Sequence, residues 1–266
     1  MYESEPDSQK LQPRSGTPLI LAASPRKGNS LLAALEFCRG LDAARNATPA
    51  RQGAPAQEAQ ERCAQERPAP VQLRHYRVLP CRDCGACERT AAQITPEEFI
   101  TDPAALCPLS NQDDSRPLLN ALAAAPLVAF CSPIYFYHLP AQLKALLDRC
   151  QIFYRAAENP ALVPALNPLP RSRPLPCSNR DEQKKYRGAG GGDGQPRPFF
   201  ALLLGARPQG DKLFEGSLLS LKYALAPLGF APQPPLLLYG LDRAADLSAR
   251  PDVLETIREY GRQAKY

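Results

Sequence analysis

The sequence predicts an α/β protein built on a doubly wound parallel sheet, because short apolar runs and helical stripes alternate along the chain. Runs of this length without polar alternation are typical of strands that helices bury on both faces. A fifth, mixed run at 71–78 fits an edge strand, which makes a five-stranded sheet with helices on both faces. The four almost wholly apolar runs are 19–23, 127–131, 199–204 and 236–239.

Four amphipathic stripes at helical spacing separate these runs. Asn29 and Ser30 form a good N-cap for the first stripe, prolines at 140 and 251 open two others, and Gly229 closes the remaining one. The stripes are Leu31, Leu35, Cys38 and Leu41; Leu139, Leu143, Leu146, Leu147 and Cys150; Leu218, Leu221, Leu225 and Leu228; and Val253, Ile257 and Tyr260.

The rhythm of strands and helices is broken at two places, and we expect one domain over 1–266 with insertions there. Residues 46–70 are rich in Ala, Pro, Gln, Arg and Glu and carry almost no large apolar side chains, which favours disorder. Residues 157–198 contain a proline cluster and then a glycine run. Loops of this length are functional lids or disordered segments, and for the second insertion both readings stay open.

Composition narrows the class of protein. The 32 basic and 27 acidic side chains are interspersed, with no basic stripe of the kind that binds nucleic acid. The polar first residues do not form a signal peptide, and no apolar run approaches the roughly 20 residues that span a bilayer. We therefore expect a cytoplasmic protein without a membrane partner. Its nine cysteines need a reason other than disulfides, since thiols stay reduced there.

The first apolar run leads through a short turn, Ser-Pro-Arg-Lys-Gly-Asn-Ser, into a helix. The first N–H groups of a helix lack intrahelical partners and its dipole favours an anion. The turn lacks the Gly-Lys-Ser/Thr ending of a P-loop and the three glycines of a dinucleotide fingerprint, so a single phosphate such as that of FMN fits better. An ordinary capped turn is the alternative. The residues that we expect at the phosphate are Ser24, Arg26, Gly28, Asn29 and Ser30.

A second segment follows the third strand, at 132–149, next to the point where the strand order of such a sheet reverses. It reads Ser-Pro-Ile-Tyr-Phe-Tyr-His-Leu-Pro-Ala-Gln-Leu-Lys-Ala-Leu-Leu-Asp-Arg. With the first turn, this segment resembles the NADPH-dependent FMN reductase and iron–sulfur flavoprotein families. Their pattern is a Ser-Pro-x-Tyr-aromatic turn before a Pro-Ala-x-Leu-Lys helix that ends in Asp-Arg.

The resemblance implies a flavodoxin-like fold with FMN bound at the strand ends. It implies that the backbone of this turn bonds the pyrimidine edge of the ring, with Tyr135 or Phe136 packed near it; alternatively, these aromatics are core residues. We expect His138 to be structural. The resemblance also suggests a homodimer and a small-molecule or protein electron donor and acceptor, with NAD(P)H possible as donor. It identifies no catalytic residue. The expected ring contacts are Ser132, Pro133, Ile134, Tyr135 and Phe136.

Three cysteines at two-residue spacing, Cys81, Cys84 and Cys87, directly follow the mixed run. Such thiolates can wrap one face of a [4Fe–4S] cluster, and Gly85 allows the sharp turn between them. The best fourth ligand is Cys107, ahead of an Asp-Asp pair. The iron–sulfur flavoproteins that the chain resembles carry a similar arrangement with a shorter gap. A cluster-free loop and a zinc site are the alternatives. Cys63 and Cys177 are weaker ligand candidates.

The leading hypothesis is an iron–sulfur flavoprotein that passes electrons between FMN and a [4Fe–4S] cluster. The first alternative is a cluster-free NAD(P)H-dependent FMN or quinone reductase. The second is a flavin-binding redox module that is not an enzyme. The cysteine motif distinguishes the leading hypothesis from the first alternative, and turnover with NAD(P)H distinguishes the two alternatives.

Overall fold

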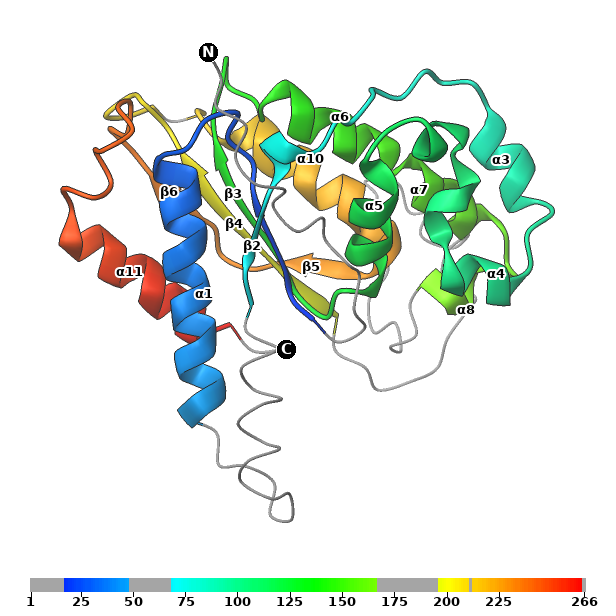
Figure 1. Ribbon diagram of the computed structural model, residues 1–266, viewed down its shortest axis with the longest axis horizontal. Helices are drawn as coiled ribbons and strands as arrows, with labels where there is room; N and C mark the ends of the chain where they lie inside the picture. Colours follow the sequence, from blue (N-terminus) through cyan, green and yellow to red (C-terminus); the bar gives the residue numbers. More distant parts are fainter. Residues whose placement is uncertain (1–16, 48–67, 167–195, 211, 265–266) are drawn as a thin grey trace.

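The computed structural model of the chain describes residues 17–47, 68–166, 196–210 and 212–264 (Figure 1). All strand pairs in this part of the chain are parallel, in the order β2-β1-β3-β4-β5, with β6 also paired to β4. The strands are β1 Leu19–Ala22, β2 Pro70–Gln72, β3 Val128–Pro133, β4 Arg197–Leu204, β5 Phe230–Pro232 and β6 Leu236–Leu238. The predicted doubly wound sheet is confirmed, and its order reverses at β1, which lies between β2 and β3.

The five expected strand positions of the sheet are present, and two short strands, β5 and β6, share the fifth position beside β4. β5 pairs with the start of β4, over Arg197–Phe199, and β6 pairs with its end, over Leu202–Leu204. Between them lie Gln-Pro-Pro at 233–235. Proline has no N–H for the ladder, so a continuous strand cannot form there. The sequence reasoning found the second half of this edge and missed β5.

The mixed run expected as an edge strand over 71–78 is mostly not a strand. β2 ends at Gln72, which pairs with Ala22, the last residue of β1. The chain then turns into a 3₁₀ helix, Leu73–His75, and Leu73 is fully buried. β2 stops because its only neighbour stops, and a strand without a partner has no ladder to extend.

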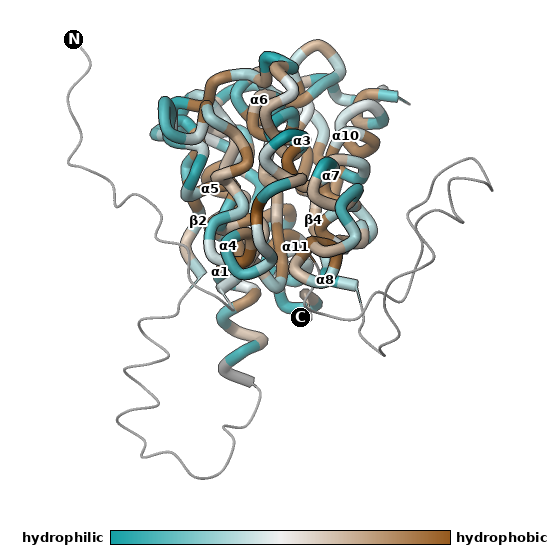
Figure 2. The backbone as a smooth tube through the Cα atoms, turned by 90° about the vertical axis from the view of Figure 1, so that its right-hand side faces the viewer, coloured by the Kyte–Doolittle hydropathy of each residue, from teal (hydrophilic) through white to brown (hydrophobic). Residues whose placement is uncertain are grey.

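Helices cover both faces of the sheet and make two separate cores. Alternate strand residues point to opposite faces. Ile20 packs with α1 Asn29–Ala47 and α11 Pro251–Arg262, whereas Leu21 belongs to the core on the other face. In Figure 2 the tube through β4 is brown, in keeping with a strand buried on both sides. The second core also contains residues of α5 Ser115–Ala124, α6 Ala141–Arg149, α7 Gln151–Glu158 and α10 Glu215–Leu225.

The four predicted helical stripes all lie in helical segments, with small shifts. The second stripe lies in α6 except at its ends, since Leu139 precedes that helix and Cys150 lies between α6 and α7. The third stripe ends in the 3₁₀ helix η4, Ala226–Leu228, followed by Gly229 in the left-handed region at φ 75°. Leu35 is exposed, because the buried face of α1 turns through Ala33, Ala34, Phe37, Cys38 and Leu41 instead.

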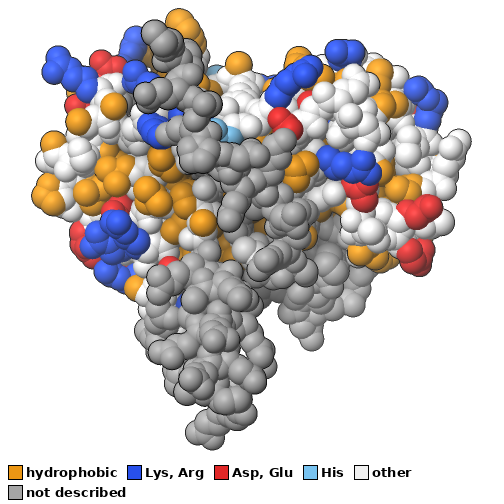
Figure 3. Space-filling model, viewed as in Figure 1, with side chains coloured by type: hydrophobic (Ala, Val, Ile, Leu, Met, Phe, Trp, Pro, Cys, Tyr) orange, Lys and Arg blue, Asp and Glu red, His pale blue; other side chains and the backbone are white. Residues whose placement is uncertain are grey.

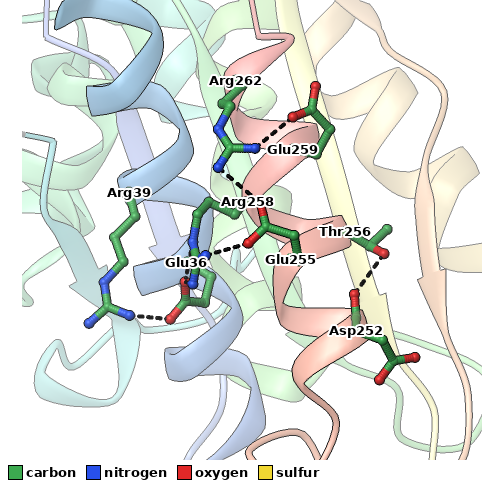
Figure 4. A network of polar contacts seen from close by, with 8 residues as sticks. All are labelled: Glu36, Arg39, Asp252, Glu255, Thr256, Arg258, Glu259 and Arg262. Carbon is green, nitrogen blue, oxygen red and sulfur yellow. Dashed lines mark hydrogen bonds and ion pairs between the residues drawn. The ribbon is translucent and has the colours of Figure 1, made fainter.

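α1 and α11 pack side by side at a close contact between two glycines (Figure 1). A Cβ on Gly40 would lie 2.0 Å from the carbonyl oxygen of Arg258, and one on Gly261 would lie 2.3 Å from that of Phe37. Ion pairs border this contact (Figure 4). The buried Glu36 carboxylate of α1 accepts from Arg258 Nη2 of α11 at 2.8 Å.

A compact group of short helices on the right of Figure 1 was not anticipated from the sequence. It contains α3 Ala86–Ala91, α4 Pro96–Thr101, η2 Pro103–Leu106, η3 Pro108–Asn111 and α8 Val163–Leu166. The first part of the insertion expected at 157–198 lies in this group, and its Leu162 and Leu166 are buried in the core. Of the insertion expected at 46–70, residues 48–67 lie outside the described part of the chain, as do residues 167–195 of the other.

Within the residues that the structure describes, none of the helices has the length and apolar character needed to cross a lipid bilayer.

Candidate functional site

The carboxyl ends of the parallel strands meet at the upper edge of the sheet in Figure 1. Loops follow the carboxyl ends of the central strands and β6, at 23–28 after β1, 134–140 after β3, 205–210 after β4 and 239–250 after β6. In open α/β sheets ligands bind at this edge, beside the strand where the order reverses. In Figure 3 Lys and Arg side chains lie among hydrophobic and other ones along this edge, as the interspersed charges of the sequence predict.

The turn after β1 is built for a close approach of the backbone. Gly28 has φ +155°, and a Cβ there would lie 3.4 Å from Ala244. Its carbonyl oxygen accepts the N–H of Leu32 at 3.1 Å as α1 begins. Ser24 and Ser30 are buried, whereas Arg26 is exposed. The turn therefore places a helix start, two hydroxyl groups and a cation at the edge of the sheet.

Two of the residues expected at the phosphate also hold a distant loop. Asn29 Nδ2 donates to the carbonyl oxygen of Arg243 at 2.8 Å, and Asn29 Oδ1 accepts the N–H of Leu247 at 3.1 Å. Arg26 Nη2 donates to the carbonyl oxygen of Asp242 at 2.9 Å. Sequence reasoning missed this loop, since no local pattern links positions more than 200 residues apart.

The turn after β3 is a tight aromatic hairpin. Tyr135 and His138 exchange two backbone hydrogen bonds, of 2.8 and 2.9 Å. The two residues between them, Phe136 and Tyr137, have φ +49° and +62°. This left-handed conformation costs a non-glycine residue roughly 1–2 kcal/mol. The two backbone hydrogen bonds offset this cost and keep Phe136 at the tip of the turn, where its side chain is fully exposed.

The expected ring contacts are not equally accessible. Ser132 is completely buried and its hydroxyl donates to the carbonyl oxygen of Pro133 at 3.0 Å. Ile134 is also buried, and its N–H donates to the carbonyl oxygen of Leu204 at 2.9 Å. The side chains of Tyr135 and Phe136 are exposed, so of the two readings for these aromatics, the core is excluded.

His138 takes part in the local structure, as expected. Its Nδ1 accepts the backbone N–H of Leu139 at 2.9 Å, and its Nε2 lies 3.0 Å from the hydroxyl oxygen of Ser220 on α10. Because Nδ1 acts as an acceptor, a neutral ring carries its proton on Nε2 and donates it to Ser220. The ring thereby fastens the hairpin to α10.

Arg207, in the loop after β4, is a residue that sequence reasoning missed. Its Nη1 donates to the hydroxyl oxygen of Tyr137 at 2.8 Å, and its guanidinium lies 5.4 Å from the centroid of that ring. Its carbonyl oxygen accepts the N–H of Gly240 at 2.9 Å. The position of Arg207 just beyond a buried strand was the only available signal. It adds a cation beside the hairpin.

The cysteine loop is exposed at Cys81 and Cys84, while Cys87 is half-buried and Cys107 is buried. Gly85 has φ +67°, so the predicted sharp turn is confirmed. Burial raises the pKa of the Cys87 thiol, a backbone hydrogen bond lowers it, and negative charge on Cys107 and Cys81 raises it further. Cys87 also packs against the core cluster that contains Cys107.

The described residues do not, however, form a finished metal centre. Over 17–47, 68–166, 196–210 and 212–264, no three His, Cys, Asp or Glu side chains are arranged to hold a metal ion. The donor set of thiols suits an iron–sulfur cluster in its chemistry, but its arrangement does not enclose one. Cys63 and Cys177 lie outside the described residues.

Comparisons with known proteins point to one family. The model of the family described as NADPH-dependent FMN reductase matches residues 19–164, more than half of the chain. No curated protein gives a significant match to the sequence.

Solved structures share the fold at low sequence identity. An NAD(P)H:quinone oxidoreductase from Methanothermobacter marburgensis is 17% identical, with a TM-score of 0.53 over 95% of this chain and 100% of that one. A flavone reductase is 10% identical, with a TM-score of 0.51 over 92% of this chain and 60% of that one. With the strand order, these similarities confirm the predicted flavodoxin-like fold.

Proposed function

This chain belongs to the NADPH-dependent FMN reductase family and is a flavin-dependent oxidoreductase, and we propose that it binds FMN between the 24–30 turn and the aromatic hairpin. One observation carries this proposal: a helix start suited to an anion and a strained, exposed aromatic hairpin follow neighbouring strands at the point where the sheet order reverses. We propose a single flavin-binding domain for the whole chain.

The phosphate of FMN would lie at the start of α1. Backbone N–H groups of the first turn, the hydroxyls of Ser24 and Ser30, and the Arg26 guanidinium supply donors of the right kind. A glycine suits position 28 of the phosphate turn, because its φ of +155° is rarely adopted by residues with a side chain and a Cβ there would lie 3.4 Å from Ala244. Asn29 contributes by holding the 242–247 loop against the turn.

The ring of FMN would lie along residues 132–136. Buried Ser132 and Ile134 keep this backbone in place, and the exposed Tyr135 and Phe136 side chains offer aromatic surface. Arg207 fixes Tyr137 and brings positive charge to the same edge, which favours anionic ligands. Bound FMN supplies the chemistry of accepting a hydride and releasing electrons in pairs or singly, while the chain supplies position and electrostatics.

The electron donor that we propose is NAD(P)H, in keeping with the family. A quinone or free flavin is the proposed acceptor, as the similar fold of a quinone oxidoreductase suggests. We further propose a cytoplasmic homodimer. Exposed aromatic and aliphatic side chains at the hairpin and on α10, namely Phe136, Tyr137, Leu219 and Tyr223, support a surface that a second copy covers.

A [4Fe–4S] cluster on Cys81, Cys84, Cys87 and Cys107 is a second candidate feature of this protein. The packing of half-buried Cys87 against the core cluster that contains Cys107 supports it. The open arrangement of the described thiols supports the cluster-free reductase equally well. No step of the proposed reaction depends on the cluster.

Replacing Ser24 and Arg26 by alanine together tests the flavin site. Each charge-assisted hydrogen bond lost should weaken FMN binding by about 1.5–3 kcal/mol, which is roughly tenfold or more. Titration of apoprotein with FMN, followed by flavin fluorescence, measures this. Lys144→Ala is the matched control, because it removes an exposed cation of α6 that pairs with Asp148. Unchanged affinity in the double variant would contradict the proposed phosphate site.

Protein purified without oxygen distinguishes the iron–sulfur flavoprotein from the cluster-free reductase, because iron, sulfide and FMN are measured in the same preparation. A cluster requires close to four iron and four acid-labile sulfide per chain, about the content of one cubane. It also requires loss of iron in each of the serine variants at the four cysteines while FMN stays bound. Protein that oxidises NAD(P)H with FMN and holds no iron after reconstitution is the cluster-free reductase.

A further inference from the structure

Arg149, the last residue of α6, is a buried arginine that joins four separate groups. Its side chain is completely inaccessible to solvent. Nη1 donates to Asp113 Oδ2 at 2.9 Å and to the carbonyl oxygen of Leu79 at 3.2 Å. Nη2 donates to the hydroxyl oxygens of Ser110 and Ser115, both at 2.8 Å. One planar cation thus joins α6 to two chain segments, one at Leu79 and one at 110–115.

Asp113 completes this network from the other side. Its Oδ2 also accepts the N–H of Leu79 at 2.8 Å, and its Oδ1 accepts the N–H and hydroxyl of Ser115 at 3.0 and 2.6 Å. Asp114 exchanges hydrogen bonds of 2.8 and 2.9 Å with the backbone of Arg77. The Asp-Asp pair therefore holds the segment at 77–79 much as a neighbouring strand would.

Both segments held by Arg149 carry cysteines. Leu79 lies two residues before Cys81, at the start of the cysteine loop. Ser110 donates its backbone N–H to the carbonyl oxygen of Cys107 at 3.0 Å. A short series of hydrogen bonds therefore runs from the cysteine loop through one guanidinium to Cys107.

The same helix is attached to the cysteine segment at its other end. Gln142, in the first turn of α6, donates its side-chain N–H to the carbonyl oxygen of Tyr76. α6 begins directly after the aromatic hairpin, so one helix connects the proposed flavin site with the cysteine loop.

We propose that Arg149 is a positioning residue that holds the cysteine loop and Cys107 together as one thiol site beside the flavin. This inference rests on the proposed function, since it concerns the thiols of the candidate [4Fe–4S] cluster. It does not require that these thiols carry iron. Removal of Arg149 should separate the two cysteine segments while leaving the sheet and the flavin turn in place.

Arg197 offers a matched control. It is also a buried arginine, and its guanidinium donates to the carbonyl oxygens of Ala123, Ala125 and Leu228. The Nε atoms of Arg149 and Arg197 both lack a partner among the described residues. Lysine at either position keeps the charge but cannot make all the bonds of the planar fork. Only the change at Arg149 should alter the thiols.

The test compares Arg149→Lys and Arg197→Lys as oxygen-free, metal-free protein. Phenylarsine oxide links two neighbouring thiols through arsenic and releases water, and mass spectrometry of digested protein identifies the joined peptides. In the parent, we expect the peptide with Cys107 joined to the one with Cys84 and Cys87. Arg149→Lys should lose this product and keep links within the cysteine loop.

Arg197→Lys should retain the joined peptides even if its melting temperature falls as far as that of Arg149→Lys. Equal loss in both variants, or no loss in Arg149→Lys, would overturn the proposal. If Arg149→Lys does not fold, Ser110→Ala removes a single hydroxyl from the network and should reduce the same product; unchanged linking in that variant would also overturn it. Failure to join Cys107 in the parent overturns it as well.

Iron and FMN are measured separately in every variant. Parent protein that lacks FMN but whose thiol linking depends on Arg149 contradicts the proposed function and supports the positioning role. A lack of iron alone contradicts only the [4Fe–4S] cluster.

Discussion

The thiols of the described cysteines differ in their access to water and therefore in their chemistry. Cys38 and Cys150 are buried, and desolvation raises the pKa of each to about 12. Cys131, fully buried in β3, also has a raised pKa for that reason. Cys81 and Cys84 are exposed, and Cys87 lies between these extremes. Because the thiolate is the reactive form, this order predicts which cysteines react.

We expect iodoacetamide to modify Cys81 and Cys84 first and Cys87 more slowly. Burial and the neighbouring thiols raise the pKa of Cys87, so its thiolate forms at higher pH than that of a free cysteine, whose pKa is about 8.5. Mass spectrometry after timed alkylation across this pH range measures each site. Cys107→Ser should speed the reaction at Cys87 and Cys150→Ser should not. Reaction at Cys87 as fast as at Cys81 would contradict this order.

Among the elements, the contact of α1 with α11 depends most on side-chain size. At Gly40 and Gly261 the backbones of the two helices approach so closely that neither position has space for a methyl group. Ion pairs of Glu36 and Arg258 lie beside this contact (Figure 4). Both helices cover the same face of the sheet, and α11 follows directly on the loop that Arg26 and Asn29 hold against the phosphate turn.

Gly261→Ala should lower the free energy of unfolding by about 1–3 kcal/mol or more, because overpacking must push the helices apart. Urea unfolding followed by circular dichroism measures the change. Gly216→Ala in α10 is the control, since a Cβ there meets its nearest atom at an ordinary 3.5 Å. That change should be neutral or stabilise by up to about 1 kcal/mol through helix propensity. A Gly261→Ala variant as stable as the control would show that the helices adjust without cost.

At the scale of the whole molecule, buried carboxylates link segments that are distant in the sequence. Burial would raise the pKa of Asp113, but hydrogen bonds from Ser115 and Leu79 and the charge of Arg149 hold it below its ordinary value. Asp102 behaves in the same way through Arg116 and Asn120. A carboxylate with a lowered pKa stabilises the fold above its unfolded pKa of about 3.9.

The stability that Asp113 provides should therefore be complete near pH 7 and decrease as the pH falls below about 4 toward its folded pKa. Asp113→Asn should reduce the free energy of unfolding near pH 7 by about 3–5 kcal/mol, because it leaves Arg149 buried without its counter-ion. It should also flatten the decrease in acid. Asp148→Asn, on the exposed face of α6, is the control and should change little. An unchanged acid profile in Asp113→Asn would contradict this assignment.

The sequence by itself determined the parts of this protein that depend on local pattern. Continuous apolar runs identified the central strands, and helical stripes identified α1, α10 and α11. The segments that begin at Ser24 and Ser132 together indicated the family through their order of small, aromatic and proline residues. Each segment follows a strand and leads into a helix. In these segments each residue's neighbours in sequence are also its neighbours in space.

Only the tertiary structure decided how distant segments meet. β2 ends at Gln72 because its partner β1 ends at Ala22. The residues of the 71–78 run do not by themselves indicate where this strand ends. Asn29 holds residues 243 and 247, and Arg149 holds Leu79, Ser110 and Asp113. Such bonds satisfy polar groups that burial removes from water, and burial is a result of packing between elements. The periodicity of apolar residues along the chain does not indicate which elements pack against each other.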